Sequence, residues 1–416
     1  MSTESRPAAA TAGHPDVESA GFVRILSRAD GDALAASGIV ARALAERETP
    51  FQVTVGRTVG ERTRRGALAD DDPDDMVLAI GAIDGDATRL DDPDRPATLE
   101  AVDLAQALGA TPDPVLALAG LVAAGLEPSA GESEWLLESA RERDLLERRP
   151  GVTVPTADPI DGLAHSTRLR APWSGDREAT AEALESIDTD AAALAEDDHR
   201  AIGSLVALDA VGADDASTHA ADAIQRVLKP DATPASPFET IGGYADVLEA
   251  TARIEPGTGA TLAMGHAARE PALEAWRTYG TRTHDALETA STRRYDGLYV
   301  LDIDDGPVEG VADVALAYRS PEPTVLVVAD AAAEDASGDA TDAGADTHTA
   351  GETAIATRDP LSATALEQIA RALEGELETL TDRSGVDYDV GRTRGYLRYD
   401  GQLERSTLVD IVREVR

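Results

Sequence analysis

The chain has 416 residues and a formal net charge of −41, because 78 Asp and Glu face only 37 Lys and Arg. Hydrophobic residues make up 42% of the sequence and aromatic residues only 3%, so we expect two ordinary folded domains with a core built mainly from Ala, Val, Leu and Ile. This hydrophobic content excludes general disorder, and the lack of cysteine excludes disulfides, thiolate metal sites and cysteine nucleophiles.

The acidity indicates a high-salt environment. Lys229 is the single lysine, and every other basic residue is arginine. We expect a cytoplasmic protein of a cytosol at molar salt, where the Debye length is about 3 Å and net charge says little about partners. The longest apolar stretch, Val115–Leu126, has 12 residues, fewer than the ~20 of a membrane helix, so no membrane association is expected. Residues 1–20 have no signal-peptide core and predict a disordered polar tail.

In the first half of the chain, short apolar runs alternate with segments of helical periodicity. Strands are predicted at Gly21–Leu26, Phe51–Val55 and Met76–Ile80, and helices at Ala33–Glu48, Pro96–Leu108 and Val115–Leu126. This alternation predicts an α/β domain with a mostly parallel sheet over residues 21–235.

A second unit follows a helical connector at residues 236–290. Over residues 291–416 we predict a smaller α/β domain, with strands at Leu298–Ile303, Thr324–Ala329 and Thr353–Thr357 and helices at Val308–Tyr318 and Leu361–Thr381. Residues 330–352 contain seven acidic residues and no Lys or Arg, which is typical of a solvated loop inserted between two strands.

Asp30 and Asp32 stand directly after the first predicted strand, where open α/β sheets bind their ligands. Two carboxylates at this place suit a hard cation such as Mn²⁺ or Mg²⁺. The alternative is a structural role, because aspartate also caps helix N-termini.

The order of several segments resembles that of DHH-family phosphoesterases, and of the archaeal RecJ-like branch in particular. The first strand and its S-x-x-D-x-D sequence are similar to the first motif of this family. Further similar segments follow in order: Gly162–Thr167, Ser174–Asp176, Ile241–Leu248, Ala275–Arg277 with His284, and Tyr318–Pro323.

This resemblance implies both a fold and an activity. It implies a DHH domain, a DHHA1-like nucleic-acid-binding domain at residues 291–416, and single-stranded DNA or RNA bound in the cleft between them. Archaeal members of this branch either degrade single strands with Mn²⁺, or act without catalysis in DNA replication and repair beside the GINS complex and the replicative helicase.

The chain departs from the family pattern at the residues that hold the metals. Arg28 replaces the histidine of the first motif, Ala33 replaces its glycine, and Gly81 stands where the second motif has an aspartate. Asp84 is a displaced candidate for that aspartate. The Asp-His-His motif is absent, and residues 125–127 read Gly-Leu-Glu where a fourth aspartate is expected.

Two-metal hydrolysis needs ligands for two cations ~3.5–4 Å apart, and Asp30 and Asp32 alone do not supply them. We therefore expect no bound metal and a catalytically degenerate protein that binds single-stranded nucleic acid. The first alternative is an active exonuclease that uses Mn²⁺ or Mg²⁺ with Asp30, Asp32 and Asp84. The second alternative is a scaffold that binds only protein.

Two arginine clusters are candidates for phosphate contacts. The first lies in a predicted loop after the second strand, and the second surrounds glycine turns near the C-terminus with a tyrosine for base stacking. Their members are Arg57, Arg64 and Arg65, and Arg392, Arg394, Tyr396 and Arg398. The alternative for the second cluster is a hairpin whose arginines pair with Asp387, Asp389 and Asp400.

Overall fold

The computed structural model of this chain covers most of the sequence. It describes residues 15–67, 74–85, 87–90, 92, 94–129, 131–187, 194–228, 230–330, 350–360, 363–380, 385–400 and 405–415. Most of the predicted N-terminal tail, at residues 1–14, and most of the predicted acidic loop, at residues 331–349, lie outside the described residues.

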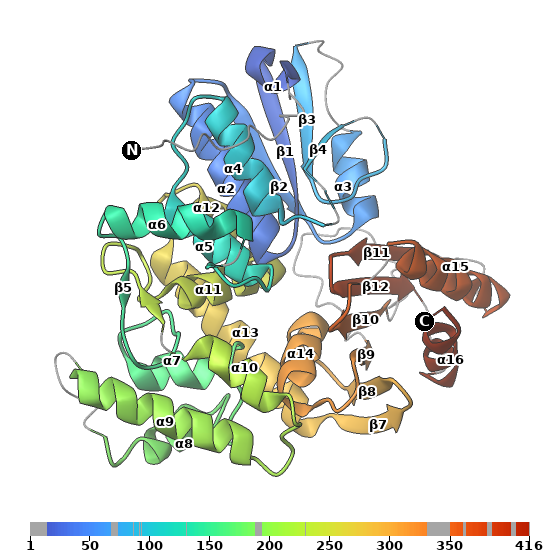
Figure 1. The fold of residues 1–416 in the computed structure, drawn as a ribbon. Helices are drawn as coiled ribbons and strands as arrows, with labels where there is room; N and C mark the ends of the chain where they lie inside the picture. The colour runs from blue at the N-terminus through green and yellow to red at the C-terminus, as the bar shows by residue number, and fades with distance from the viewer. Residues whose placement is uncertain are drawn as a thin grey trace, which may run out of the picture.

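A parallel four-stranded sheet forms the first unit (Figure 1). Its spatial order is β2-β1-β3-β4, and β1 pairs in parallel with both of its neighbours. The strands are β1 (Phe22–Arg28), β2 (Phe51–Gly56), β3 (Asp75–Ile80) and β4 (Thr88–Leu90). All carboxyl ends of a parallel sheet point the same way, so the loops after β1 and β3 meet at one edge.

Helices pack in this unit against the sheet and against one another, and several of them are rich in alanine. They are α1 (Pro15–Ser19), α2 (Gly31–Glu46), α3 (Val59–Gly66), α4 (Ala97–Ala107), α5 (Pro114–Ala123) and α6 (Glu134–Glu142), with a 3₁₀ turn at Gly131–Ser133. Their small side chains allow close approach: a Cβ at Gly38 would lie 2.4 Å from the carbonyl oxygen of Ala263. A core with few aromatic residues therefore reaches normal density through short interhelical distances.

The middle of the chain is helical. Its helices are α7 (Pro159–His165), α8 (Arg177–Ala183), α9 (Glu196–Gly212), α10 (Ala220–Val227), α11 (Ile241–Ile254), α12 (Pro256–Ala263) and α13 (Arg269–Thr289). A short antiparallel pair, β5 (Glu147–Arg148) and β6 (Asp231–Ala232), lies among them. Helix α11 packs against α2, α5 and α13, so this segment joins the core of the first unit to the second.

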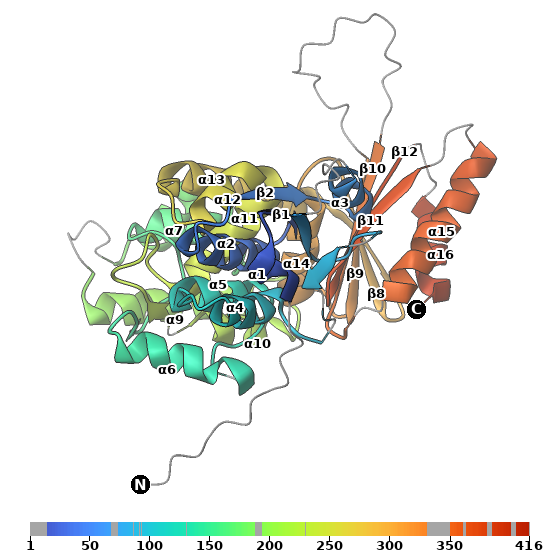
Figure 2. The ribbon, with the colours of Figure 1, turned by 90° about the horizontal axis from the view of Figure 1, so that it is seen from above.

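The second unit is a six-stranded mixed sheet of order β11-β12-β10-β9-β8-β7. Its elements are β7 (Ser291–Tyr295), β8 (Leu298–Ile303), α14 (Val308–Val314), a π-helical turn (Ala315–Arg319), β9 (Thr324–Asp330), β10 (Ala350–Thr357), α15 (Ala363–Leu380), β11 (Val386–Val390), β12 (Arg394–Asp400) and α16 (Arg405–Val415). Figure 2 shows α15 and α16 on the outer face of this sheet, while α14 lies on the inner face. Alternate residues of β12 accordingly belong to two different hydrophobic clusters, with Tyr396 in one and Leu397 in the other.

The predicted fold class is confirmed: a parallel α/β unit, a helical connector and a smaller α/β unit. Two local predictions need correction. The end of the predicted tail forms α1, because Val17 is buried in the core of the first unit. The predicted loop of Arg64 and Arg65 is helix α3, which Thr58 caps by accepting a hydrogen bond from the amide of Glu61. Among the helices of the described part of the chain, none has the length and apolar character needed to cross a bilayer.

Candidate functional site

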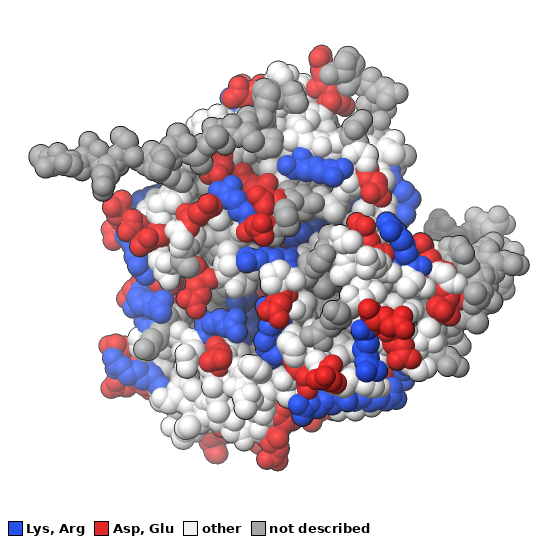
Figure 3. Space-filling model, turned by 45° about the vertical axis from the view of Figure 1, so that its right-hand side comes forward, with Lys and Arg blue, Asp and Glu red and all other residues white. Residues whose placement is uncertain are grey.

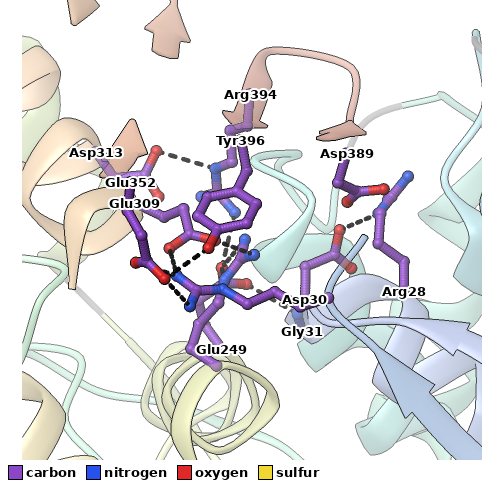
Figure 4. A network of polar contacts seen from close by, with 12 residues as sticks. Arg28, Asp30, Gly31, Glu249, Glu309, Asp313, Glu352, Asp389, Arg394 and Tyr396 are labelled. Atoms are coloured by element: carbon purple, nitrogen blue, oxygen red, sulfur yellow. Dashed lines mark hydrogen bonds and ion pairs between the residues drawn. The ribbon is translucent and has the colours of Figure 1, made fainter. Parts of the chain in front are cut away.

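The carboxyl ends of β1 and β3 face β11 and β12 of the second sheet across a cavity of about 500 Å³. The surface on this side is hollowed near its middle, and basic side chains gather around the hollow (Figure 3). Inside the cavity, charged residues from both units form one network of polar contacts (Figure 4). The cavity therefore lies where the resemblance places a catalytic and substrate-binding cleft.

Arg28 and Asp30 form an ion pair at the end of β1. Nε of Arg28 donates to Oδ2 of Asp30, and only 13% and 11% of the two side chains are exposed. Burial acts to raise the pKa of Asp30, but the charges of Arg28 and Arg253 outweigh it and bring that pKa to about 2. Arg28 also lies against Gly81, where a Cβ would come within 3.0 Å of the Cβ of Arg28. The arginine thus occupies the space beside the position where the second motif would carry its aspartate.

Both carboxylates of the D-x-D sequence cap helices. Asp30 is the N-cap of α2 and accepts from the amide of Ala33 at 2.8 Å. Asp32 accepts from the amides of Ala97 at 2.9 Å and Thr98 at 3.0 Å, at the start of α4. Burial, and then the negative charge of Asp30, raise the pKa of Asp32 to about 6. Both aspartates thus make the capping contacts that the sequence offered as the alternative, and Asp32 caps a helix other than its own.

The residues present do not fit a two-metal centre. Each carboxylate oxygen of Asp30 and Asp32 accepts a hydrogen bond from a protein donor, and the guanidinium of Arg28 adds a positive charge beside them. Asp84 lines the cavity but is exposed on the loop after β3. Within the described ranges, no group of three or more His, Asp or Glu side chains is placed to hold a metal ion.

Glu249 of α11 connects the first unit with β12. Its Oε2 accepts from the amide of Gly31 at 2.8 Å, while its Oε1 contacts Arg253 at 2.9 Å and Arg394 at 3.1 Å. Nε of Arg394 lies 2.9 Å from Oδ1 of Asp313. The guanidinium of Arg394 is thus held by two carboxylates of its own chain.

Arg57 and Tyr396 are held in the same network. Arg57 contacts Glu309 at 2.7 Å and Glu352 at 3.1 Å, and its guanidinium lies over the ring of Tyr396 at 4.1 Å from the centroid. The Tyr396 hydroxyl donates to Glu352 at 2.8 Å. Burial opposes ionisation of Glu309, but Arg57 and Arg253 bring its pKa to about 2. Tyr396 is only 3% exposed, which differs from the predicted role in base stacking: its ring faces Arg57 and the core.

A second contact between the units joins α3 to β11. The buried side chain of Arg62 lies 2.5 Å from Asp389. Asp387 accepts from the hydroxyl of Thr58 at 2.7 Å and from the amide of Gly60 at 3.0 Å. Asp387 and Asp389 thus bind residues of the first unit.

The other predicted phosphate ligands are exposed. Arg64 and Arg65 lie on α3, and Arg65 pairs with Glu61 at 2.6 Å. Arg392 and Arg398 are exposed on the β11–β12 hairpin, and Arg392 has no carboxylate partner among the described residues. The described residues that line the cavity include nine carboxylates and six guanidinium groups. The formal charge of the lining is therefore negative, which does not favour binding of a polyanion.

Three arginines that the sequence analysis did not select gather around the π-helical turn. The hydroxyl of Tyr318 in this turn donates to the carbonyl of Arg168 at 2.8 Å, and Arg358 donates to the carbonyl of Leu316 at 2.7 Å. Arg226 lies on α10, which packs against the same turn. None of the three has a carboxylate in ion-pair contact among the described residues, and Nε of Arg168 is buried without a hydrogen-bond partner.

These arginines are electrostatic neighbours. Burial, and the charges of Arg394 and Arg226, lower the pKa of Arg168, although Asp246 opposes the shift. Burial and Arg226 likewise lower the pKa of Arg358. Arg168 thus lies within electrostatic range of Arg394 and Arg226, and Arg358 within range of Arg226; we call Arg168, Arg226 and Arg358 the arginine row. The sequence gives only a weak signal for it, because its members are single arginines in three distant segments.

The arrangement of the two units is similar to that of a solved structure. A crystal structure of CDC45 from Entamoeba histolytica is similar over 95% of this chain and 95% of that chain, with a TM-score of 0.59 and 8% identity. A crystal structure of exonuclease RecJ bound to manganese matches over 96% of this chain and 91% of the RecJ chain, with a TM-score of 0.43 and 14% identity.

The sequence itself defines the narrower family. Over 338 residues the chain is 44% identical to uncharacterized protein rrnAC1427 of the haloarchaeon Haloarcula marismortui. This alignment covers 80% of this chain and 85% of that protein. Residues 290–414 match the family model described as the C-terminal domain of rrnAC1427. The chain belongs to the rrnAC1427 family.

Proposed function

We propose that this protein is a catalytically silent DHH-fold protein that binds single-stranded nucleic acid in DNA replication or repair. The observation that carries the silent role is the ion pair of Arg28 with Asp30 in the cleft. An arginine there provides positive charge but does not lower the pKa of a bound water as a metal does. The remnant motif thus stabilises the fold instead of activating a nucleophile.

The row of arginines supports nucleic-acid binding. Among the residues that the structure describes, no carboxylate forms an ion pair with Arg168, Arg226 or Arg358, in a chain of net charge −41. Guanidinium groups bind phosphate oxygens with two parallel hydrogen bonds, and such groups remain available only where no carboxylate holds them. We place the nucleic-acid backbone along this row and past the exposed Arg392, with residues 291–416 as the nucleic-acid-binding domain.

High salt makes protein partners necessary for the proposed binding to nucleic acid. Counterion release weakens phosphate binding steeply as salt rises, so a protein in a high-salt cytosol needs further contacts to stay on its target. Partners of the replisome, such as the GINS complex or the replicative helicase, would supply such contacts.

The first experiment tests catalysis. Labelled single-stranded DNA and RNA are incubated with the purified chain and Mn²⁺ in KCl on the order of 1 M. We expect no degradation by the wild type or by the Asp30→Ala/Asp32→Ala variant. Degradation that requires Mn²⁺ and is lost in the double variant would replace this proposal with the exonuclease that uses Asp30, Asp32 and Asp84.

The second experiment tests binding. We expect Arg226→Glu to weaken binding of a labelled single-stranded oligonucleotide at least tenfold, measured by fluorescence anisotropy in the same buffer. Arg200→Glu is the matched control, because Arg200 is also an exposed helical arginine but pairs with Glu196 and Asp197. Equal losses in both variants would show a general charge effect and contradict the proposed row.

A protein scaffold is the second candidate function. The observation in its favour is the lining of the cavity, where nine carboxylates outnumber six guanidinium groups. If neither DNA nor RNA binds, and GINS subunits are recovered with the chain in a pull-down, the scaffold replaces the nucleic-acid-binding function.

A further inference from the structure

The guanidinium of Arg168, three residues after α7, is partly buried and has no hydrogen-bond acceptor among the described residues. Its Nε is completely buried. Its two Nη atoms also lack an acceptor in the described part of the chain, but solvent reaches them. A buried cation without a partner costs free energy, so a group of this kind calls for an anion or for ordered water.

The carboxylate of Asp246 attracts Arg168 electrostatically but forms no ion pair with it. Its Oδ2 accepts hydrogen bonds from the hydroxyl of Ser166 at 2.8 Å and from Nε1 of Trp276 at 2.9 Å. Its Oδ1 accepts from the hydroxyl of Thr167 at 2.6 Å. Asp246 is thus held by the residues that precede Arg168 and does not contact the guanidinium.

The surroundings of Arg168 add positive charge. Burial lowers the pKa of Arg168, and the charges of Arg394 and Arg226 lower it further. Arg394 is held by two carboxylates, whereas the terminal nitrogens of Arg358 donate only to backbone carbonyls. The described carboxylates therefore leave the charge of the arginine row uncompensated.

The π-helical turn at Ala315–Arg319 holds the backbone of Arg168 in place. The hydroxyl of Tyr318 in this turn donates to the carbonyl of Arg168 at 2.8 Å, and the amide of Ser217 donates to the carbonyl of Tyr318 at 2.7 Å. Segments of π-helix are rare and are frequent at functional sites. The turn is thus a second feature that points to a ligand at Arg168.

We propose that the two Nη atoms of Arg168 bind a small monovalent inorganic anion, which is chloride in a cytosol rich in KCl. Two accessible N–H groups on one side of a guanidinium satisfy a single spherical ion, which needs no further donors in a fixed direction. Mass action fills even a weak site: with a Kd on the order of 0.1 M, chloride at ~1 M occupies about nine tenths of the molecules.

Chloride at Arg168 also regulates the binding of nucleic acid, and this part of the inference rests on the function proposed above. A phosphodiester carries one negative charge, as chloride does, so a strand that reaches Arg168 displaces the ion one for one. The affinity for nucleic acid then falls with chloride concentration in addition to the general effect of salt on phosphate contacts.

The first test locates the anion. Crystals of the full chain are grown in KBr, because bromide replaces chloride and its anomalous scattering identifies it. We expect a bromide peak in contact with both Nη atoms of Arg168 and no such peak in Arg168→Gln. Arg170→Gln is the matched control and should keep the peak, because Arg170 is also a partly or fully buried arginine of this segment but pairs with Glu288 at 2.5 Å.

Two results of this test would overturn the proposed site. One is a bromide peak at this place that persists in Arg168→Gln. The other is a wild-type guanidinium that contacts a carboxylate of its own chain, or only water, in crystals grown in KBr.

The second test measures displacement. Oligonucleotide affinity is measured by fluorescence anisotropy over a range of KCl and over the same range of KF, because the smaller fluoride ion costs more free energy to remove from water. For the wild type we expect each tenfold rise in KCl to reduce the affinity about tenfold more than the same rise in KF. For Arg168→Gln the two salts should have equal effects, and Arg170→Gln should behave as the wild type does.

Equal effects of KCl and KF on the wild type would overturn displacement. A bromide ion on Arg168 in a chain that binds no oligonucleotide would support the anion site and contradict the proposed function. Oligonucleotide binding without a bromide peak would do the reverse. Failure of the anion site is thus distinct from failure of the proposed function.

Discussion

The guanidinium of Arg28 is paired with the carboxylate of Asp30, two residues further along the chain, at the end of the central strand β1. The same aspartate caps α2, so one side chain links Arg28 to the start of the helix behind it. The pair therefore contributes to the fold of the first unit.

Removing the arginine alone is expected to destabilise the protein. Arg28→Met leaves a buried carboxylate without its partner, and we expect the free energy of unfolding to fall by about 3 kcal/mol in urea titrations at constant KCl. Arg28→Met combined with Asp30→Asn removes both charges and is expected to recover most of that loss. If the double variant is as unstable as the single one, the ion pair is not the main role of Arg28.

Introducing an aspartate at position 81, where the family resemblance implies one, is expected to fail. Gly81 has a φ of +100°, and its missing Cβ would lie 3.0 Å from the Cβ of Arg28. Gly81→Asp should therefore lower stability by about 1–3 kcal/mol and produce no nuclease activity with Mn²⁺. Gly85→Asp separates the two causes, because Gly85 has a φ of +105° and open space around it. A loss at position 81 no larger than at position 85 would show that crowding by Arg28 contributes nothing.

Acid is expected to destabilise the fold through His284. This ring is 1% exposed and contacts the carbonyl of Ser166 at 2.9 Å, and burial lowers its pKa to about 4. In the unfolded chain this histidine binds a proton near pH 6.5. The contribution of the neutral His284 ring to the free energy of unfolding is therefore complete above pH 6.5 and is lost as the pH falls towards 4. Between pH 7.5 and 4.5 we expect the wild type to lose about 2–3 kcal/mol more than His284→Gln in urea titrations. The exposed His266→Gln should keep the wild-type pH dependence.

Tyr396 is expected to serve stability and not base stacking. Tyr396→Phe removes the hydrogen bond to Glu352 but keeps the ring beneath Arg57, so unfolding should become easier by about 1 kcal/mol. Oligonucleotide affinity at the same temperature should not change. Weaker oligonucleotide binding by a fully folded Tyr396→Phe variant would contradict this prediction and show that Tyr396 takes part in nucleic-acid binding.

The sequence predicted the main elements of the fold well. The apolar runs became β1, β2 and β3 in one parallel sheet, and the helical connector and second α/β unit are present. Local periodicity carries this information, because burial on one face of a helix or on both faces of a parallel strand leaves a regular pattern. Helix α3 was not predicted because it is short and mostly polar, and only its Thr58 cap marks its start.

The residues of the candidate site were harder to assign. Arg57 and Arg394 looked available in the sequence, yet Glu309 and Glu352 hold the first, and Glu249 and Asp313 hold the second. These partners stand between 81 and 295 positions away along the chain. No local pattern predicts such pairs in a sequence with so many carboxylates.

The sequence by itself determined the α/β architecture, the strongly acidic composition and the presence of Arg28, Asp30 and Asp32 after the first predicted strand. Only the tertiary structure decided which arginines remain available, that Tyr396 is buried, and that Asp32 caps α4. The physical reason is that burial and charge pairing depend on which distant segments meet, whereas helix and strand formation depend mainly on neighbouring residues.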